Sequence, residues 1–168
     1  MRDLIDTKSF LRECVSWRIR LIRYPRIFHV LDVEEFDRWI KSARLTLDSA
    51  WSDLNSGFYN WACFKAQQAA ELAVKAYFHG IGQPKTGHSV SALLSLLNAP
   101  QDLIDKAKYL DKMYIPTRYP DAWTDETPAY YYTRKEAEES IKYAEEIIKF
   151  VEELWRTLLQ KERGRGGG

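Results

Sequence analysis

The sequence decides the fold between residues 133 and 158, which read TRKEAEESIKYAEEIIKFVEELWRTL. Apolar residues recur there in alternating steps of four and three, which is the spacing of one face of an α-helix. The series is Ala137, Ile141, Ala144, Ile148, Val151, Trp155 and Leu158. Thr133 and Glu136 have the spacing of a capping box, which marks the start of a helix. This stretch therefore predicts a long helix that packs lengthwise in a bundle.

Helical periodicity also covers most of the chain before that stretch. Residues 33–54, 58–79, 89–97 and 100–114 each carry apolar residues in steps of three or four, and no segment alternates as a β-strand does. The second of these helices is rich in alanine, which lets a neighbouring helix approach closely. In the first, the predicted inner face is Phe36, Ile40, Ala43, Leu47, Ala50, Trp51 and Leu54. We therefore predict an all-α fold, an antiparallel up-and-down bundle of four or five helices.

Three segments fall outside this pattern. Residues 116–132 have no period and hold three prolines, so we expect an ordered loop held by its aromatic side chains. Residues 1–31 carry seven basic and three acidic side chains, a net charge of +4, and we predict that they form a basic extension with one amphipathic helix. Residues 161–168, KERGRGGG, are predicted to be a disordered tail, which leaves residues 32–160 as the bundle.

Composition excludes several classes of protein. With 168 residues, 45% of them apolar and 29% charged, the chain has the size and balance of one globular domain. The predicted bundle, residues 32–160, has a net charge of −5, which is unlike a general binder of duplex DNA. Two cysteines and no Cys/His cluster argue against a zinc site, so we expect no metal and no cofactor. Without a membrane-length apolar run or a signal peptide, a cytoplasmic location is expected.

A polar stripe crosses the alanine-rich helix. Gln67, Glu71 and Lys75 follow one another at intervals of four residues, so they share one face. Two interpretations are open. The stripe is either an ordinary solvated face with a Glu–Lys pair, or one wall of a binding site in which Glu71 keeps Lys75 ordered for an anion.

The aperiodic loop carries a second polar group. Tyr114 is followed by Arg118-Tyr119-Pro120-Asp121, and a guanidinium can hold a phosphate with two parallel hydrogen bonds. In that interpretation Asp121 orients the guanidinium, and Tyr114 and Tyr119 stack on a base. In the alternative, Arg118 forms a structural salt bridge with Asp121 or Glu71. His88 precedes the third helix, where capping or a hydrogen bond to the loop is the ordinary role.

Together these residues resemble the HEPN family of small helical domains. The resemblance covers residues 36–158 and rests on Gln67-Gln68-Ala69-Ala70-Glu71 with Lys75, on Gly87-His88-Ser89, and on Arg118-Tyr119-Pro120-Asp121. It implies an up-and-down bundle that pairs as a homodimer with a cleft at the interface. It also implies one of two roles: partner of a minimal nucleotidyltransferase in a toxin–antitoxin pair, or metal-independent endoribonuclease.

The sequence departs from the ribonuclease branch of that family. That branch uses an Arg, four to six arbitrary residues and then a His, whereas Arg118 is followed by YPDAWTDETP. An arginine cannot transfer the protons that RNA cleavage requires, so Asp121 or His88 would have to do so. Residues 23–29, RYPRIFH, fit the spacing but precede the first bundle helix, and we interpret them as a chance match.

Three functions remain open on this basis. The first is a non-catalytic dimeric module that binds a nucleotide or an RNA phosphate and acts with a separate nucleotidyltransferase chain. Its expected ligand-binding residues are Gln67, Glu71, Lys75, Tyr114, Arg118, Tyr119 and Asp121. The second is an endoribonuclease with a degenerate motif, whose catalytic candidates are Arg118, Asp121 and His88. The third is a purely structural dimerisation domain. A further hypothesis is that the basic residues 1–31 bind a partner chain, RNA or the acidic bundle of the dimer mate.

Overall fold

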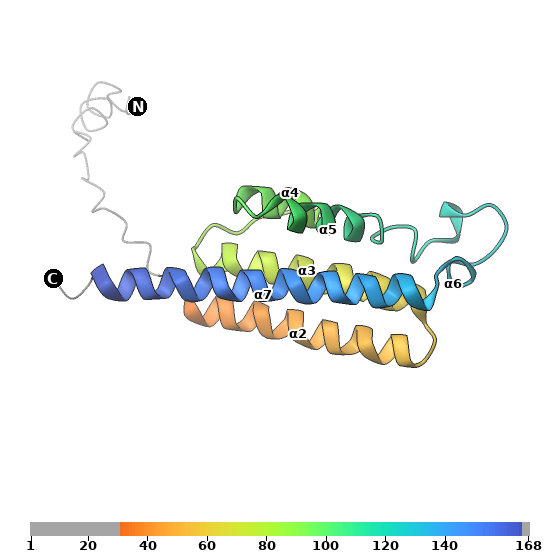
Figure 1. Ribbon diagram of the computed structural model, residues 1–168, viewed down its shortest axis with the longest axis horizontal. Helices are drawn as coiled ribbons and strands as arrows, with labels where there is room; N and C mark the ends of the chain where they lie inside the picture. The colour runs from red at the N-terminus through yellow and green to blue at the C-terminus, as the bar shows by residue number, and fades with distance from the viewer. Residues whose placement is uncertain (1–30, 166–168) are drawn as a thin grey trace, which may run out of the picture. The chain divides into compact units, whose positions relative to one another are not determined.

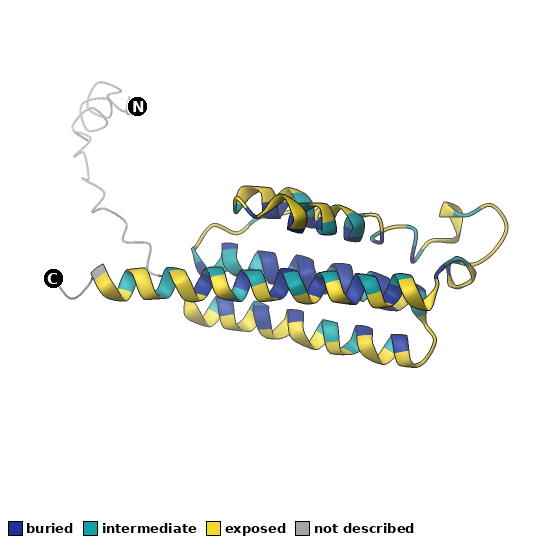
Figure 2. Cartoon of the chain, in the orientation of Figure 1, coloured by how far each residue is buried: buried dark blue, intermediate teal, exposed yellow. Residues whose placement is uncertain are grey.

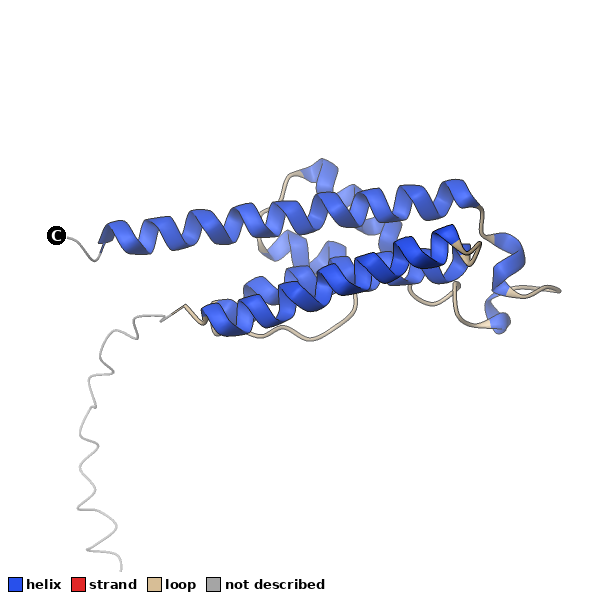
Figure 3. Cartoon of the chain, turned by 90° about the horizontal axis from the view of Figure 1, so that it is seen from below, coloured by secondary structure: helices blue, strands red, loops and turns tan. Residues whose placement is uncertain are grey.

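The computed structural model describes residues 31–165, and all regular elements in this range are helical (Figure 1 and Figure 3). Three long helices lie side by side, and two short ones cover α3 and α7 on the side away from α2. In chain order the helices are α2 (Val33–Asn55), α3 (Tyr59–Gly80), α4 (Val90–Leu96), α5 (Gln101–Asp111), the 3-10 helix η1 (Pro120–Ala122), α6 (Pro128–Tyr131) and α7 (Arg134–Arg165). The predicted all-α bundle is confirmed. The amphipathic helix predicted within residues 1–31 and the RYPRIFH segment lie outside the described residues.

Helix α3 is the centre of the bundle, because it packs against all five other α-helices of the described range. Its alanines make this possible: Ala62, Ala66, Ala69, Ala70, Ala73 and Ala76 have no exposed surface. Only Trp61 of this helix is exposed, and Figure 2 shows the buried positions where α2, α3 and α7 meet. The small side chains predicted to allow close approach are thus the ones that bury the middle helix.

The direction of the helices follows from contacts at one end of the bundle. The N–H of Asp32, before α2, donates to the carbonyl of Gly80 at the end of α3. Phe36 of α2 stacks on Trp155 near the end of α7, with ring centroids 4.3 Å apart. Helix α2 is therefore antiparallel to both α3 and α7, whereas α3 and α7 run the same way. Residues 81–133 connect the end of α3 to the start of α7, and so carry the chain back to the end of the bundle at which α3 begins.

The helix starts follow the capping chemistry of the sequence. The Asp32 carboxylate accepts the N–H of Glu35 at 2.9 Å, which caps α2. Thr133 and Glu136 form the predicted capping box: the Thr133 hydroxyl accepts the N–H of Glu136, and the Glu136 carboxylate accepts that of Thr133. Gly57, with a φ of 82°, follows the end of α2, where a left-handed residue suits glycine.

Three details of the prediction need correction. Trp51 is exposed, and its indole N–H donates to Glu145 at 3.1 Å, because the adjacent Ala50 already occupies the buried position. The loop of residues 116–132 contains two short helices, η1 and α6, each begun by a proline at its first turn. Helix α7 continues to Arg165, so residues 161–165 of the predicted tail are helical. None of the helices in the described range is both long and apolar enough to cross a membrane.

Candidate ligand-binding site

The polar stripe of α3 is buried. Gln67 has no exposed surface, and the side chains of Glu71 and Lys75 are only 6% and 13% exposed. The interpretation as a solvated helix face is therefore wrong. A buried charge is costly unless it is paired and hydrogen-bonded, so these three residues call for the partners described next.

The Glu71 carboxylate collects donors from two segments. Lys75 Nζ lies 2.7 Å from its Oε1, and the side-chain amides of Gln67 and Gln68 donate to its Oε2 at 3.3 and 3.2 Å. From the loop before α4, His88 Nδ1 lies 3.2 Å from Oε1. A carboxylate only accepts hydrogen bonds, so this contact places a ring proton on Nδ1. The Gln67 amide also donates to the His88 carbonyl at 2.9 Å, which ties the loop to α3.

Arg118 lies in an aromatic cage that consists of Phe64, Tyr114 and Tyr119. Its Cζ atom is 4.4 Å from the ring centroids of Phe64 and Tyr114 and 5.0 Å from that of Tyr119. The Nε–H donates to the Tyr114 carbonyl at 2.8 Å. Such contacts orient the guanidinium plane without neutralising its charge.

The expected salt bridges of Arg118 are not formed. Among residues 31–165, no ion pair joins Arg118 to Asp121 or to Glu71, and Asp121 is exposed in η1. The orientation that we assigned to Asp121 is supplied by the cage and the Tyr114 carbonyl instead. The outer nitrogens of the guanidinium make no hydrogen bond within the described part of the chain, so they are free to act as donors.

The position of Arg118 is fixed by the residue before it. Thr117 is fully buried, and its hydroxyl donates to the Met113 carbonyl at 2.6 Å. The buried amide of Asn60, in the first turn of α3, donates to the Thr117 carbonyl at 3.0 Å. The Trp123 indole donates to the Pro116 carbonyl at 2.8 Å. The loop is therefore fastened on both sides of Thr117.

His88 joins the two polar groups. Its ring stacks on Tyr114, with centroids 4.7 Å apart and an angle of 16° between the planes. Tyr114 is also a wall of the cage, so contacts run without a break from Lys75 through Glu71, His88 and Tyr114 to Arg118. We call these five residues the candidate site. The free donors of Arg118 suit the binding of an anion, and the donors around Glu71 compensate the charge of that buried carboxylate.

Comparison with known proteins identifies the family. The family model of the HEPN domain matches residues 36–154. The chain belongs to the HEPN family. No curated protein matches it.

Solved structures, two of them described as HEPN proteins, share the fold at substantial sequence identity. The crystal structure of TT1696 from Thermus thermophilus is 48% identical, with a TM-score of 0.68, and covers 70% of this chain and 96% of that one. ST0689, an archaeal HEPN homologue, is 41% identical, with a TM-score of 0.63 and coverages of 71% and 96%. A HEPN domain protein from Thermotoga maritima is 42% identical, with a TM-score of 0.59 and coverages of 71% and 98%.

Sequence reasoning found most members of the site in this HEPN domain but not their arrangement. It missed Phe64, although this residue lies three positions before Gln67 and so extends the same helical stripe. It considered His88 only as a cap, a loop contact or a catalytic group, because nothing in a linear sequence indicates that the His88 ring stacks on Tyr114. Tyr119 belongs to the cage and is 51% exposed, whereas Asp121 forms no hydrogen bond or ion pair with the site within residues 31–165.

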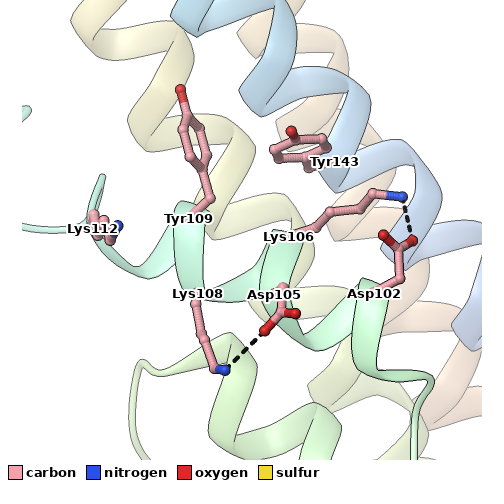
Figure 4. Close-up of a pocket in the computed structure, with 7 residues that line it drawn as sticks. All are labelled: Asp102, Asp105, Lys106, Lys108, Tyr109, Lys112 and Tyr143. Atoms are coloured by element: carbon pink, nitrogen blue, oxygen red, sulfur yellow. Dashed lines mark hydrogen bonds and ion pairs between the residues drawn. The ribbon is translucent and has the colours of Figure 1, made fainter.

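A separate surface pocket of the HEPN domain lies between α5 and α7 (Figure 4). It is lined by Asp102, Asp105, Lys106, Lys108, Tyr109, Lys112 and Tyr143. Two of its three lysines are already paired: Lys106 with Asp102 and with Glu146 of α7, and Lys108 with Asp105. Two aspartates also line this pocket, whereas Arg118 is held by its aromatic cage and has no carboxylate partner in the described range, so the candidate site suits an anion better.

Proposed function

We propose that this HEPN domain is a non-catalytic module that binds a nucleotide or an RNA phosphate at Arg118. In this proposal it works in the cytoplasm as a homodimer, together with a minimal nucleotidyltransferase chain in a toxin–antitoxin-like system. The family supplies the precedent for the partner and the dimer, while the site supplies the argument for the ligand.

One observation carries the proposal: the guanidinium of Arg118 is oriented by three rings and a carbonyl, yet no acid in the described range neutralises it. The two acids that the sequence offered as its partners, Asp121 and Glu71, do not pair with it. A phosphate is the partner that a fixed and unneutralised guanidinium suits best.

The test compares three variants by binding of ATP and of a short single-stranded RNA. Arg118→Ala is expected to lose binding of at least one of these ligands, and Arg118→Lys is expected to retain part of it through charge alone. Arg134→Ala is the matched control, because Arg134 pairs on the surface with Glu138 outside the site. If the wild-type chain gives no thermal shift and no binding heat with either ligand, the proposal fails and a structural role remains.

His88 favours one second candidate, a metal-independent ribonuclease. The Glu71 contact holds a proton on Nδ1, which leaves Nε2 able to accept the proton of a 2′-hydroxyl while Arg118 stabilises the phosphorane. RNA cleavage in EDTA that is lost in both Arg118→Ala and His88→Gln decides for this candidate. The binding module predicts no cleavage by the wild-type protein.

A further inference from the structure

The charge of the candidate site depends on one proton. Arg118 and Lys75 are cations, Glu71 is the carboxylate between them, and His88 adds a charge only when it is protonated. The net charge of these four groups is therefore +1 with neutral His88 and +2 with the imidazolium. The other charged groups near His88 are Lys85, which lines the same small pocket, and Asp111 of α5, which accepts the hydroxyl of Ser89.

The two states of His88 present different atoms to a ligand. In the neutral ring the Nδ1 proton faces Glu71, and Nε2 carries a lone pair that repels the oxygen of an anion. In the protonated ring Nε2 becomes a donor. The side chain of His88 is 58% exposed, so more than half of its surface can be reached from solvent.

Two neighbours keep their contacts with the ring in either protonation state. Glu71 remains hydrogen-bonded to Nδ1 in both states, so protonation does not break the contact that positions the ring. Tyr114 stacks on the ring and offers its π face to the new charge, as it does to Arg118.

We propose that protonated His88 is a second ligand of the phosphate held by Arg118, so that the site selects a dianionic, terminal phosphate and binds it together with a proton. This inference rests on the proposed function and adds the class of ligand. A phosphodiester inside an RNA strand carries one negative charge, whereas a terminal phosphate carries up to two, and only the latter matches the charge of +2.

The experiment uses sulfate, whose charge of −2 does not change between pH 5.5 and 8, and methyl sulfate, which carries −1. Binding of each to the full chain is measured calorimetrically at pH 5.5 and 8.0 in pairs of buffers with different ionisation heats, which counts the protons taken up. For wild type we expect sulfate affinity about tenfold higher at pH 5.5, with uptake of up to one proton. The affinity for methyl sulfate is expected to rise less between pH 8.0 and pH 5.5.

The matched variants are His88→Gln and His79→Gln. The first keeps an amide donor for Glu71 but cannot be protonated, so its sulfate affinity, whatever its value at pH 8.0, should not rise at pH 5.5. The second removes a histidine near Trp39 on the face between α2 and α3 and should behave as wild type. Proton counting on the wild-type chain is independent of whether either variant folds.

The outcomes separate the two proposals. Sulfate binding that is independent of pH and takes up no proton overturns the role of His88 and leaves the proposed function standing. An equal gain for methyl sulfate overturns the preference for a dianion. Absence of sulfate binding at both pH values, or binding that persists unchanged in Arg118→Gln, overturns this inference, whereas the proposed function fails only if ATP and RNA binding are also absent or unaffected by Arg118→Ala.

Discussion

Glu71 and Lys75 form an ion pair of 2.7 Å one turn apart on α3, with both side chains largely removed from water. On an exposed helix such a pair contributes a few tenths of a kcal/mol. Inside the bundle its role is different, because each charge offsets part of the free-energy cost of burying the other.

We therefore expect Lys75→Met to reduce the free energy of unfolding by about 3 kcal/mol, because the Glu71 charge stays buried without its cation. The double variant Glu71→Gln/Lys75→Met should lose less than Lys75→Met alone, since no charge is then left unpaired. Urea unfolding of the two variants and wild type measures the difference. Losses in the double variant that equal or exceed those of Lys75→Met contradict the interpretation.

A second prediction concerns a close approach between α3 and α7. A Cβ atom added to Gly80 would lie 2.6 Å from a ring carbon of Trp155, which is itself stacked on Phe36. Gly80→Ala should therefore destabilise the protein by about 1–3 kcal/mol through forced displacement of that ring. Gly164→Ala is the control, because nothing lies within 4 Å of its added atom and its effect should stay within about 0.5 kcal/mol. Thermal unfolding of both variants provides the measurement.

The pH dependence of stability is expected to involve His79. Its ring stacks on Trp39 at 4.1 Å, and burial lowers the pKa of His79 below its ordinary value, although Glu35 acts in the opposite direction. The unfolded chain then binds a proton more readily than the folded one, so stability is full above the unfolded pKa and falls as the pH drops below it. Replacing His79 with Gln should reduce the loss between pH 7.5 and 5.5 in urea unfolding. An undiminished loss excludes His79 as its source.

The reactivity of Cys63 provides a further check on the core. Burial raises the pKa of the Cys63 thiol to about 12, and the residue has no exposed surface. In a Cys14→Ser background, iodoacetamide at pH 8 should leave Cys63 unmodified in the native protein and alkylate it fully in urea. Mass spectrometry distinguishes the two states, and rapid native alkylation shows that the α3–α7 contact opens readily.

The fold was predictable because its signals are local. The period of residues 133–158, the capping box at Thr133 and the alanines of α3 each act within a few turns of one helix. The parallel run of α3 and α7 was not predicted, since it depends on how residues 81–133 cross the bundle. The prediction that Trp51 is buried was wrong for the same reason, because whether it or a neighbouring position is buried depends on where α7 lies.

Most residues of the candidate site could be predicted from the sequence, but the contacts between them could not. Residues spaced four apart on one helix share a face, so Gln67, Glu71 and Lys75 could be grouped from the sequence. Their burial could not be inferred, because the loop that covers them approaches from 17 positions away at His88. Nearness in sequence was also misleading, since Asp121 lies three residues from Arg118 and does not pair with it.

The loop that carries Arg118 is fastened through main-chain carbonyl groups, those of Met113, Pro116 and Thr117. Every amino acid provides such a carbonyl, so substitutions at the exposed Tyr119 and Asp121 leave the anchors in place. Related domains can thus change the side chains at positions 119 and 121 while the backbone of the loop stays the same. A new ligand preference then requires only a few mutations.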